Sequence, residues 1–216
     1  MKKALLGVLL LVLVGVGGVI YRNALEHPSQ PIACPLDAKV CPDGTAVSRT
    51  GTACTFPACP PPNVSLPDAG ISFALPAGFA ATTPPDSASL AAYDSGSVST
   101  STEPASIVIR RFQIEASSTA LATIQATAIG GASGAPLPAT AFSSVVLGAN
   151  HRFTVAQIER FEGTVDVAYY LARGNDVLRF DAIDRQVQGW TDASIDVSTL
   201  PAQKALRQML ATLQGQ

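Results

Sequence analysis

RFTVAQIERFEGTVDVAYYLARGNDVLRFDAID, residues 152–184, is the stretch of sequence from which the fold can be worked out. Apolar residues alternate through its middle at the two-residue period of a half-buried strand. They are Val165, Val167, Tyr169 and Leu171. Gly174-Asn175 then precedes a second apolar run, 177–180, which predicts a hairpin with Gly174 at the positive φ that primed turns require. A further turn at 161–164 and a strand at 153–160 complete a predicted three-stranded antiparallel meander.

Outward from the meander, shorter patterns predict the remaining elements. Strands are expected at 89–93, 106–114 and 142–147. A helix is expected from Ser117 or Ser118, either of which could cap it, to Ile129, before a Gly-Gly stop. A terminal helix should begin near Pro201, with an apolar face at helical spacing. That face comprises Leu206, Met209, Leu210 and Leu213. The order of elements predicts an α+β fold, an antiparallel sheet flanked by helices.

The first strand of this region carries a more specific pattern. GISFALPAGF, residues 70–79, resembles the entry strand of PsbP-like domains, although Phe79 stands where that family often has Trp. Together with the layout of strands and terminal helix, the resemblance covers residues 66–214. It implies an α/β/α sandwich and, because the family includes accessory subunits, a role in binding a partner. Another α+β sandwich is the alternative.

The N-terminus has the layout of an export segment. Lys2-Lys3 precede an uncharged run from Ala4 to Ile20, followed by Tyr21-Arg22. This pattern predicts a signal anchor or uncleaved transmembrane helix at residues 1–22, in contact with the membrane through residues 4–20. The best candidate for a signal-peptidase site, residues 16–18, is poor. A cleaved signal peptide remains the alternative to an uncleaved anchor. The positive-inside rule places the rest of the chain outside the cytoplasm, as a single-pass protein of the cell membrane.

All four cysteines lie between residues 34 and 59, after a polar linker at 23–33. On an exported chain, Cys34, Cys41, Cys54 and Cys59 indicate two disulfides, because so short a segment cannot build a core of its own. Three pairings are possible. The spacing lacks the paired C-x2-C of zinc sites. A Pro-rich linker, 60–65, follows and separates this module from the α+β domain, 66–216.

VCPDG, residues 40–44, resembles the central turn of Kazal-type domains, although those have six cysteines. The resemblance implies the pairs Cys34–Cys54 and Cys41–Cys59. It also raises a protease inhibitor as an alternative function.

Composition and motifs give little catalytic chemistry. The formal net charge is -2 and no basic stripe is present, which argues against nucleic acid as a partner. The two histidines are His27, in the linker, and His151, at a strand start. Ser133 misses the G-x-S-x-G elbow of hydrolases, since residue 135 is Ala. We therefore expect no catalytic residue and no cofactor.

Two other features of the sequence could form binding sites. Five late carboxylates could in principle hold calcium, but their spacing fits no calcium loop, and no metal site is expected. They are Asp176, Asp181, Asp184, Asp192 and Asp196. Trp190, in a polar loop, either anchors a partner or folds back onto the domain.

These observations predict a membrane-anchored, extracytoplasmic, non-catalytic binding or accessory protein of the cell envelope, with an unknown envelope protein as partner. The alternatives are a secreted protease inhibitor acting through the cysteine module and an envelope hydrolase that would have to use His151.

Overall fold

The computed structural model describes residues 2–26, 33–41, 45–96, 105–131, 133–148 and 151–215. The chain divides into two compact units, residues 1–38 with 48–57, and residues 39–47 with 58–216. The second unit contains the large β-sheet. The first contains α1 (Lys2–Glu26), a helix of 25 residues. Among the described residues, no helix combines the length and the apolar character that crossing a membrane requires, so the predicted transmembrane helix is unsupported.

Two disulfides join the four cysteines, as predicted. Cys34 is bonded to Cys54 and Cys41 to Cys59, which are the pairs that the Kazal resemblance implies. No free cysteine remains among the described residues. Each bond lies within one of the two units, so each unit has a covalent staple of its own.

The described residues of the cysteine module include one small sheet. β1 (Ala38–Val40) and β2 (Ala46–Ser48) form a two-stranded sheet. In the first unit, Arg49 Nε donates to Asp37 at 2.8 Å, and the Arg49 guanidinium lies 4.3 Å from the centre of the Phe56 ring. The Asp43-Gly44 turn, on which the Kazal resemblance rests, lies outside the described residues, as does His27.

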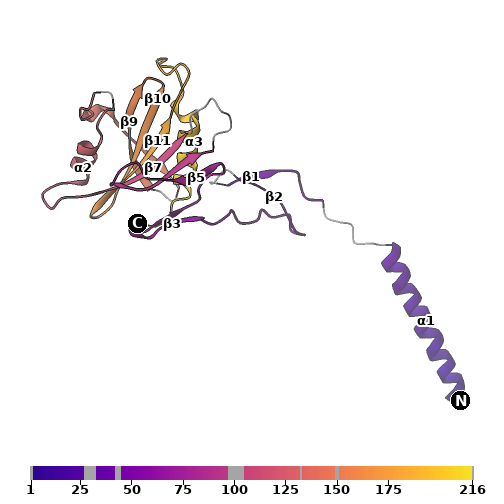
Figure 1. The fold of residues 1–216 in the computed structure, drawn as a ribbon. Helices are drawn as coiled ribbons and strands as arrows, with labels where there is room; N and C mark the ends of the chain where they lie inside the picture. Colours follow the sequence, from indigo (N-terminus) through magenta and orange to yellow (C-terminus); the bar gives the residue numbers. More distant parts are fainter. Residues whose placement is uncertain are drawn as a thin grey trace. The chain divides into compact units, whose positions relative to one another are not determined.

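The second unit is built on a seven-stranded antiparallel sheet in the order β5-β6-β7-β11-β10-β9-β8 (Figure 1). Its strands are β5 (Phe79–Thr82), β6 (Ser89–Ser95), β7 (Ser106–Gln113), β8 (Phe142–Leu147), β9 (His151–Phe161), β10 (Thr164–Ala172) and β11 (Asp176–Asp184). The sheet, with its flanking helices, confirms the predicted α+β class. The predicted meander is formed by β9, β10 and β11, which lie next to one another from the centre of the sheet toward one edge.

The two turns of the meander differ in backbone conformation. Gly163, between β9 and β10, has a φ of 80°, and Glu162 before it a φ of 49°. Gly174, between β10 and β11, is not among the positive-φ glycines, and a Cβ added there would meet no atom within 4 Å. The hairpin prediction was therefore correct, but the positive φ assigned to Gly174 was wrong. Instead, the turn is closed by the Arg173 N–H, which donates to the Asp176 carbonyl at 2.9 Å.

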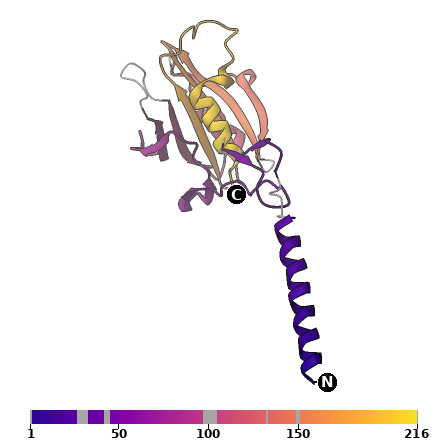
Figure 2. The same ribbon diagram turned by 90° about the vertical axis from the view of Figure 1, so that its right-hand side faces the viewer.

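Two helices cover opposite faces of the sheet, α2 (Ala120–Thr127) and α3 (Pro201–Ala211) (Figure 1). Figure 2 shows α3, in yellow, lying across the face of the sheet that is turned to the viewer. Successive residues of a strand point to opposite faces. Accordingly, Tyr169 of β10 belongs to the buried cluster that contains α3, and Tyr170 to the cluster that contains Ile124 of α2. This is the layering expected of a sheet sandwiched between helices.

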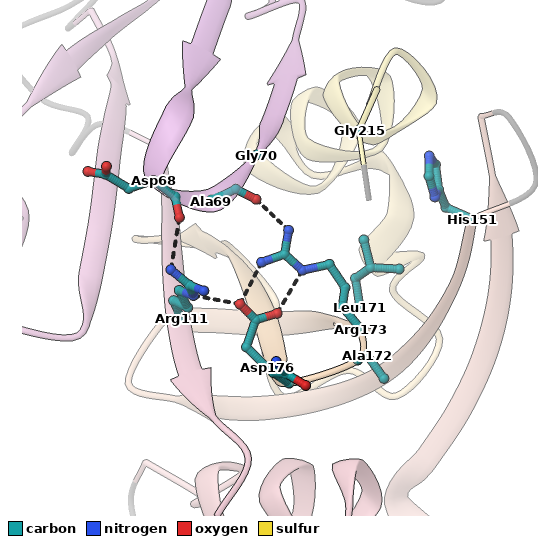
Figure 3. Close-up of a pocket in the computed structure, with 12 residues that line it drawn as sticks. Asp68, Ala69, Gly70, Arg111, His151, Leu171, Ala172, Arg173, Asp176 and Gly215 are labelled. Carbon is teal, nitrogen blue, oxygen red and sulfur yellow. Dashed lines mark hydrogen bonds and ion pairs between the residues drawn. The ribbon is translucent and has the colours of Figure 1, made fainter.

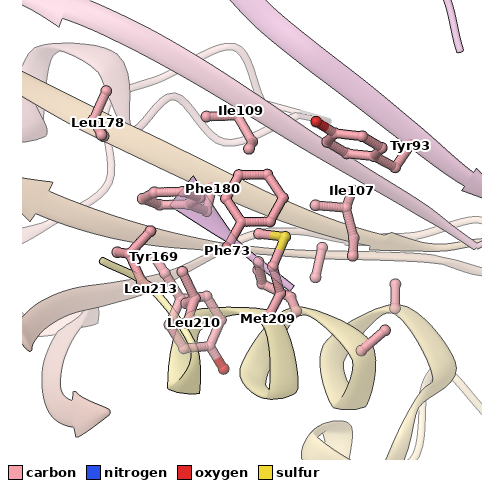
Figure 4. Packing of buried hydrophobic residues seen from close by; sticks show 14 of the residues in the cluster. Phe73, Tyr93, Ile107, Ile109, Tyr169, Leu178, Phe180, Met209, Leu210 and Leu213 are labelled. Atoms are coloured by element: carbon pink, nitrogen blue, oxygen red, sulfur yellow. The ribbon is translucent and has the colours of Figure 1, made fainter. Parts of the chain in front are cut away.

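The larger core lies between α3 and the sheet (Figure 4). The four residues of the predicted apolar face are all buried, although α3 ends at Ala211 and Leu213 lies just after it: Leu206, Met209, Leu210 and Leu213. They pack against side chains from the central strands and against Phe73, which is fully buried. Burying one side chain of this size contributes roughly 1.5–3 kcal/mol, so this face fixes α3 on the sheet.

The start of α2 differs from the prediction. Thr119, rather than Ser117 or Ser118, is the N-cap residue, and its hydroxyl accepts the Ala122 N–H at 3.1 Å. All three residues carry the hydroxyl that a cap requires, so the sequence could not choose among them.

The entry segment forms its own small sheet. β3 (Val64–Leu66) pairs with β4 (Ile71–Phe73), and the short helix η1 (Pro67–Ala69) connects them. β3 therefore begins within the segment predicted to be linker. Ser72 exchanges two backbone hydrogen bonds with Gln214, of 3.0 and 2.8 Å, which holds the entry segment against the chain that follows α3. This pairing brings η1 to one end of the large sheet.

Candidate functional site

A pocket of about 590 Å³ opens at the end of the sheet where β10 turns into β11 (Figure 3). Its walls come from segments far apart in the sequence. They are η1 with Gly70, the end of β7, the start of β9, the β10–β11 turn and the chain after α3. The lining residues are Asp68, Ala69, Gly70, Arg111, His151, Leu171, Ala172, Arg173, Gly174, Asn175, Asp176 and Gly215.

Two arginines converge on Asp176 at the base of this pocket (Figure 3). Arg173 binds the carboxylate with two groups, Nε at 2.7 Å from Oδ1 and Nη2 at 2.6 Å from Oδ2. Arg111 Nε donates to Oδ2 at 2.5 Å. Arg173 comes from the turn and Arg111 from β7, so Asp176 ties two parts of the sheet together through charge-assisted hydrogen bonds.

The same arginines hold the entry segment. Arg111 Nη1 donates to the Asp68 carbonyl at 2.8 Å, and Arg173 Nη1 donates to the Ala69 carbonyl. The carboxylate of Asp68 points away from Arg111 (Figure 3), so Asp68 contributes its backbone to the pocket. Each guanidinium is therefore anchored at both ends and holds one orientation.

Asp176 stays ionised in this arrangement. Burial would raise the pKa of its carboxyl, but the hydrogen bonds from Arg173 and Arg111 outweigh this effect and hold the pKa below its ordinary value. The carboxylate carries no proton to give, and paired with two cations it is a weak base. The base of the pocket can bind charge, but it is not suited to moving protons.

The rest of the lining carries few reactive groups. Its twelve described residues include no hydroxyl, thiol or amine nucleophile, that is no serine, threonine, tyrosine, cysteine or lysine. His151 stands across the pocket from Asp176 (Figure 3), with its ring edge-on to Phe153 at 6.4 Å between ring centres. Ser133, the serine considered for a hydrolase, is not in the lining, and its Oγ accepts the Ala135 N–H at 3.2 Å in a local turn.

The late carboxylates do not assemble into one site. Asp176 lies in the pocket, Asp181 pairs with Arg179, and Asp184 accepts the Ala202 N–H at 2.7 Å. Asp192 and Asp196 each accept from a nearby serine, Ser194 and Ser198 respectively. Across the residues that the structure describes, no three His, Cys, Asp or Glu side chains gather to hold a metal ion.

Trp190 packs back onto the domain in part. It is half-buried against the larger core, and its ring meets Phe161 edge-on at 6.1 Å between ring centres. Phe161 itself is 44% exposed. Arg160 Nε donates to the Trp190 carbonyl at 2.5 Å, which fixes the loop. Trp190 also lines a shallow hollow of about 440 Å³, so part of the indole remains accessible.

Sequence reasoning missed the pocket. It did not find the partner of Arg111, which lies 65 residues away. The pair Arg173 and Asp176, three residues apart across a turn, was the one local signal available. The disulfide cysteines and Trp190, the residues singled out from the sequence, all lie outside the pocket.

Comparison with known proteins adds little. No family model matches the chain, and no curated protein matches it. A crystal structure of a protein from Bacteroides thetaiotaomicron VPI-5482 is similar, with 14% identity and a TM-score of 0.43. The similarity covers 68% of this chain and 46% of that one, so the chain spans less than half the length of that protein. Similarity at this level carries no argument about function.

Proposed function

We propose that the protein is a non-catalytic binding protein that works outside the cytoplasm, and that it takes a small ligand in the pocket at the β10–β11 turn. The observation that carries the proposal is the base of that pocket, where Arg111 and Arg173 are fixed on an ionised Asp176. A rigid, charged base in a cavity of about 590 Å³ suits recognition of a small molecule.

The extracytoplasmic location rests on the disulfides. Cys34–Cys54 and Cys41–Cys59 use every cysteine of the chain. Disulfides persist in oxidising compartments and are rare in the cytosol. The layered arrangement of α2, sheet and α3 is that of the PsbP-like domains which residues 66–214 resemble, and that resemblance implies an accessory role at the envelope.

A pocket-filling variant tests the proposal. Gly174 lines the pocket, has ordinary φ and has open space around it, so Gly174→Trp should occupy the cavity without straining the backbone. Gly96 also has ordinary φ and open space but is not in the lining, so Gly96→Trp is the matched control. The full-length chain would be titrated with succinate, citrate, inorganic phosphate, glucose and putrescine, followed by 15N-resolved spectra.

Shifts confined to the lining residues, abolished in Gly174→Trp and retained in Gly96→Trp, are the expected result. Spectra that no compound perturbs at the pocket would contradict the proposal. So would hydrolytic activity of the wild-type chain that disappears in His151→Ala, because it would make the pocket catalytic.

Partner binding through Trp190 stays a prediction. Its half-buried ring and the exposed Phe161 form a small aromatic surface, which is the kind of contact that anchors protein interfaces. A specific envelope protein captured by the full-length chain, and lost in both Trp190→Ala and Phe161→Ala, would support it. Capture that neither substitution changes would rule out this surface.

A further inference from the structure

The surface of the pocket's base is cationic, although Arg111, Arg173 and Asp176 carry a total charge of only +1. The three side chains differ in exposure: Arg111 is 33% exposed, Arg173 12% and Asp176 4%. The carboxylate that compensates the arginines therefore lies beneath them. A ligand entering the pocket meets guanidinium edges first, at short range, where the sign of the nearest charge decides the interaction.

Arg111 keeps hydrogen-bonding capacity for a ligand. Its Nε and Nη1 are occupied by Asp176 and the Asp68 carbonyl. Its Nη2 has no hydrogen-bond partner among the described residues, and this group carries two N–H donors. The side chain is already held in place, so a ligand would not bear the entropy cost of ordering it.

The remaining lining is compatible with a negative ligand. Asp68 turns its carboxylate away from Arg111, and the other lining residues besides His151 are uncharged. A cation would meet two guanidinium groups, whereas the exposed carboxylate of the lining, that of Asp68, is turned away from Arg111. A neutral ligand would leave the free donors of Arg111 without a charged acceptor.

We infer that this pocket binds the carboxylate or phosphate group of a small anionic solute, with Arg111 Nη2 as the donor that contacts the ligand. The inference rests on the proposed function and names the class of its ligand. A guanidinium group donates paired hydrogen bonds to the oxygens of a carboxylate and of a phosphate alike. The pocket could therefore take a ligand that carries either group.

Calorimetric titration of the full-length chain tests the inference with the same five compounds. Succinate and citrate represent carboxylates, inorganic phosphate represents phosphates, glucose is neutral and putrescine cationic. We expect at least one anion to bind, and its dissociation constant to rise with added NaCl because salt screens partly exposed charges. The anion that binds most tightly shows whether the ligand carries a carboxylate or a phosphate group.

Arg111→Gln should weaken anion binding by roughly tenfold or more, because it removes a charged donor. Asp176 keeps both hydrogen bonds from Arg173 in this variant, and thermal melting verifies that it folds. Arg111→Lys retains the positive charge but replaces the forked guanidinium with a single ammonium group. This variant should bind the anion with an affinity between those of the wild type and Arg111→Gln. Arg152→Gln is the matched control, because Arg152 is exposed, neighbours His151 and is not in the lining.

The outcomes separate this inference from the proposed function. Anion binding lost in Arg111→Gln and kept in Arg152→Gln supports both. Binding of glucose or putrescine at the pocket, without the anions, overturns the anionic ligand and leaves the binding function standing. Anion binding that is equal in the two variants overturns the role of Arg111. If none of the five compounds binds, both are overturned.

Discussion

Asp166 of β10 and Asp181 of β11 are two buried carboxylates that share one cation, Arg179. Arg179 Nε donates to Asp181 at 2.6 Å, whereas its Nη2 lies 4.0 Å from Asp166. Arg110 also donates to Asp181. Asp166 Oδ1 is buried with no hydrogen-bond partner among the described residues. Burial also raises the pKa of Asp181, but the charges and hydrogen bonds of Arg179 and Arg110 oppose that rise, so Asp166 is the member of the pair that the site favours in protonated form.

The titration of Asp166 follows from this geometry. Burial raises the pKa of Asp166 well above its ordinary value, and the neighbouring Asp181 raises it further, against the opposing charge of Arg179. Between the ordinary and the raised pKa, the folded protein holds a proton that the unfolded chain has released. The free energy of unfolding contributed by this residue therefore falls as pH rises through that window.

Asp166→Asn should consequently stabilise the protein near pH 7 and have less effect near pH 4. Asn cannot ionise, so the variant avoids the cost of a buried carboxylate that grows with pH. Urea denaturation at the two pH values measures the difference. Asp181→Asn is the contrasting variant and should destabilise by roughly 3 kcal/mol or more, because it removes the buried carboxylate that lies closest to both Arg179 and Arg110. An Asp166→Asn variant less stable at pH 7 than at pH 4, relative to wild type, would contradict this assignment.

At the scale of elements, the two turns of the meander respond differently to the same change. Gly163→Ala should destabilise by about 1–2 kcal/mol, because a side chain resists its φ of 80°. Gly174→Ala should stay within about 0.5 kcal/mol of wild type or become slightly more stable, because its φ is ordinary and its surroundings are open. Thermal melting of the two variants side by side makes the comparison. Equal losses would show that both turns need glycine.

Helix α3 depends on a cap supplied from the sheet. Its N-cap residue, Leu200, has no side chain that can cap, and Asp184 Oδ1 on β11 accepts the Ala202 N–H instead. Asp184→Ala should destabilise by about 1 kcal/mol, whereas Asp184→Asn retains an acceptor oxygen and should lose less. Chemical denaturation distinguishes them. If the two variants lose the same stability, the hydrogen bond to α3 is not what Asp184 contributes.

Elements with a strong period could be predicted, and contacts between distant elements could not. The middle strand of the meander, β10, and the apolar face at the C-terminal helix followed from alternation and helical spacing alone. The conformation of Gly174 did not, because a four-residue turn can be closed without positive φ. The pocket required Leu178 to pair with Arg111, which places Arg111 beside Asp176. No local pattern encodes that register.

For the molecule as a whole, the disulfides are the most direct chemical test. Thiol titration of the denatured, unreduced chain should find no free cysteine, and reduction should release four thiols. The double variant Cys41→Ser with Cys59→Ser should lose roughly 3 kcal/mol, because that bond closes a loop with a sequence separation of 18. Free thiols before reduction would contradict the pairing and weaken the case for an extracytoplasmic location.

The order of the bonded cysteines along the chain has a consequence for proteolysis. Cys41 lies between Cys34 and Cys54, and Cys54 lies between Cys41 and Cys59, so the two loops overlap. A protease that cuts once anywhere between residues 34 and 59 therefore cuts inside at least one closed loop. The two fragments stay tethered and migrate as one band until a reductant is added, so a nick in this region does not release the α+β domain from the N-terminal helix.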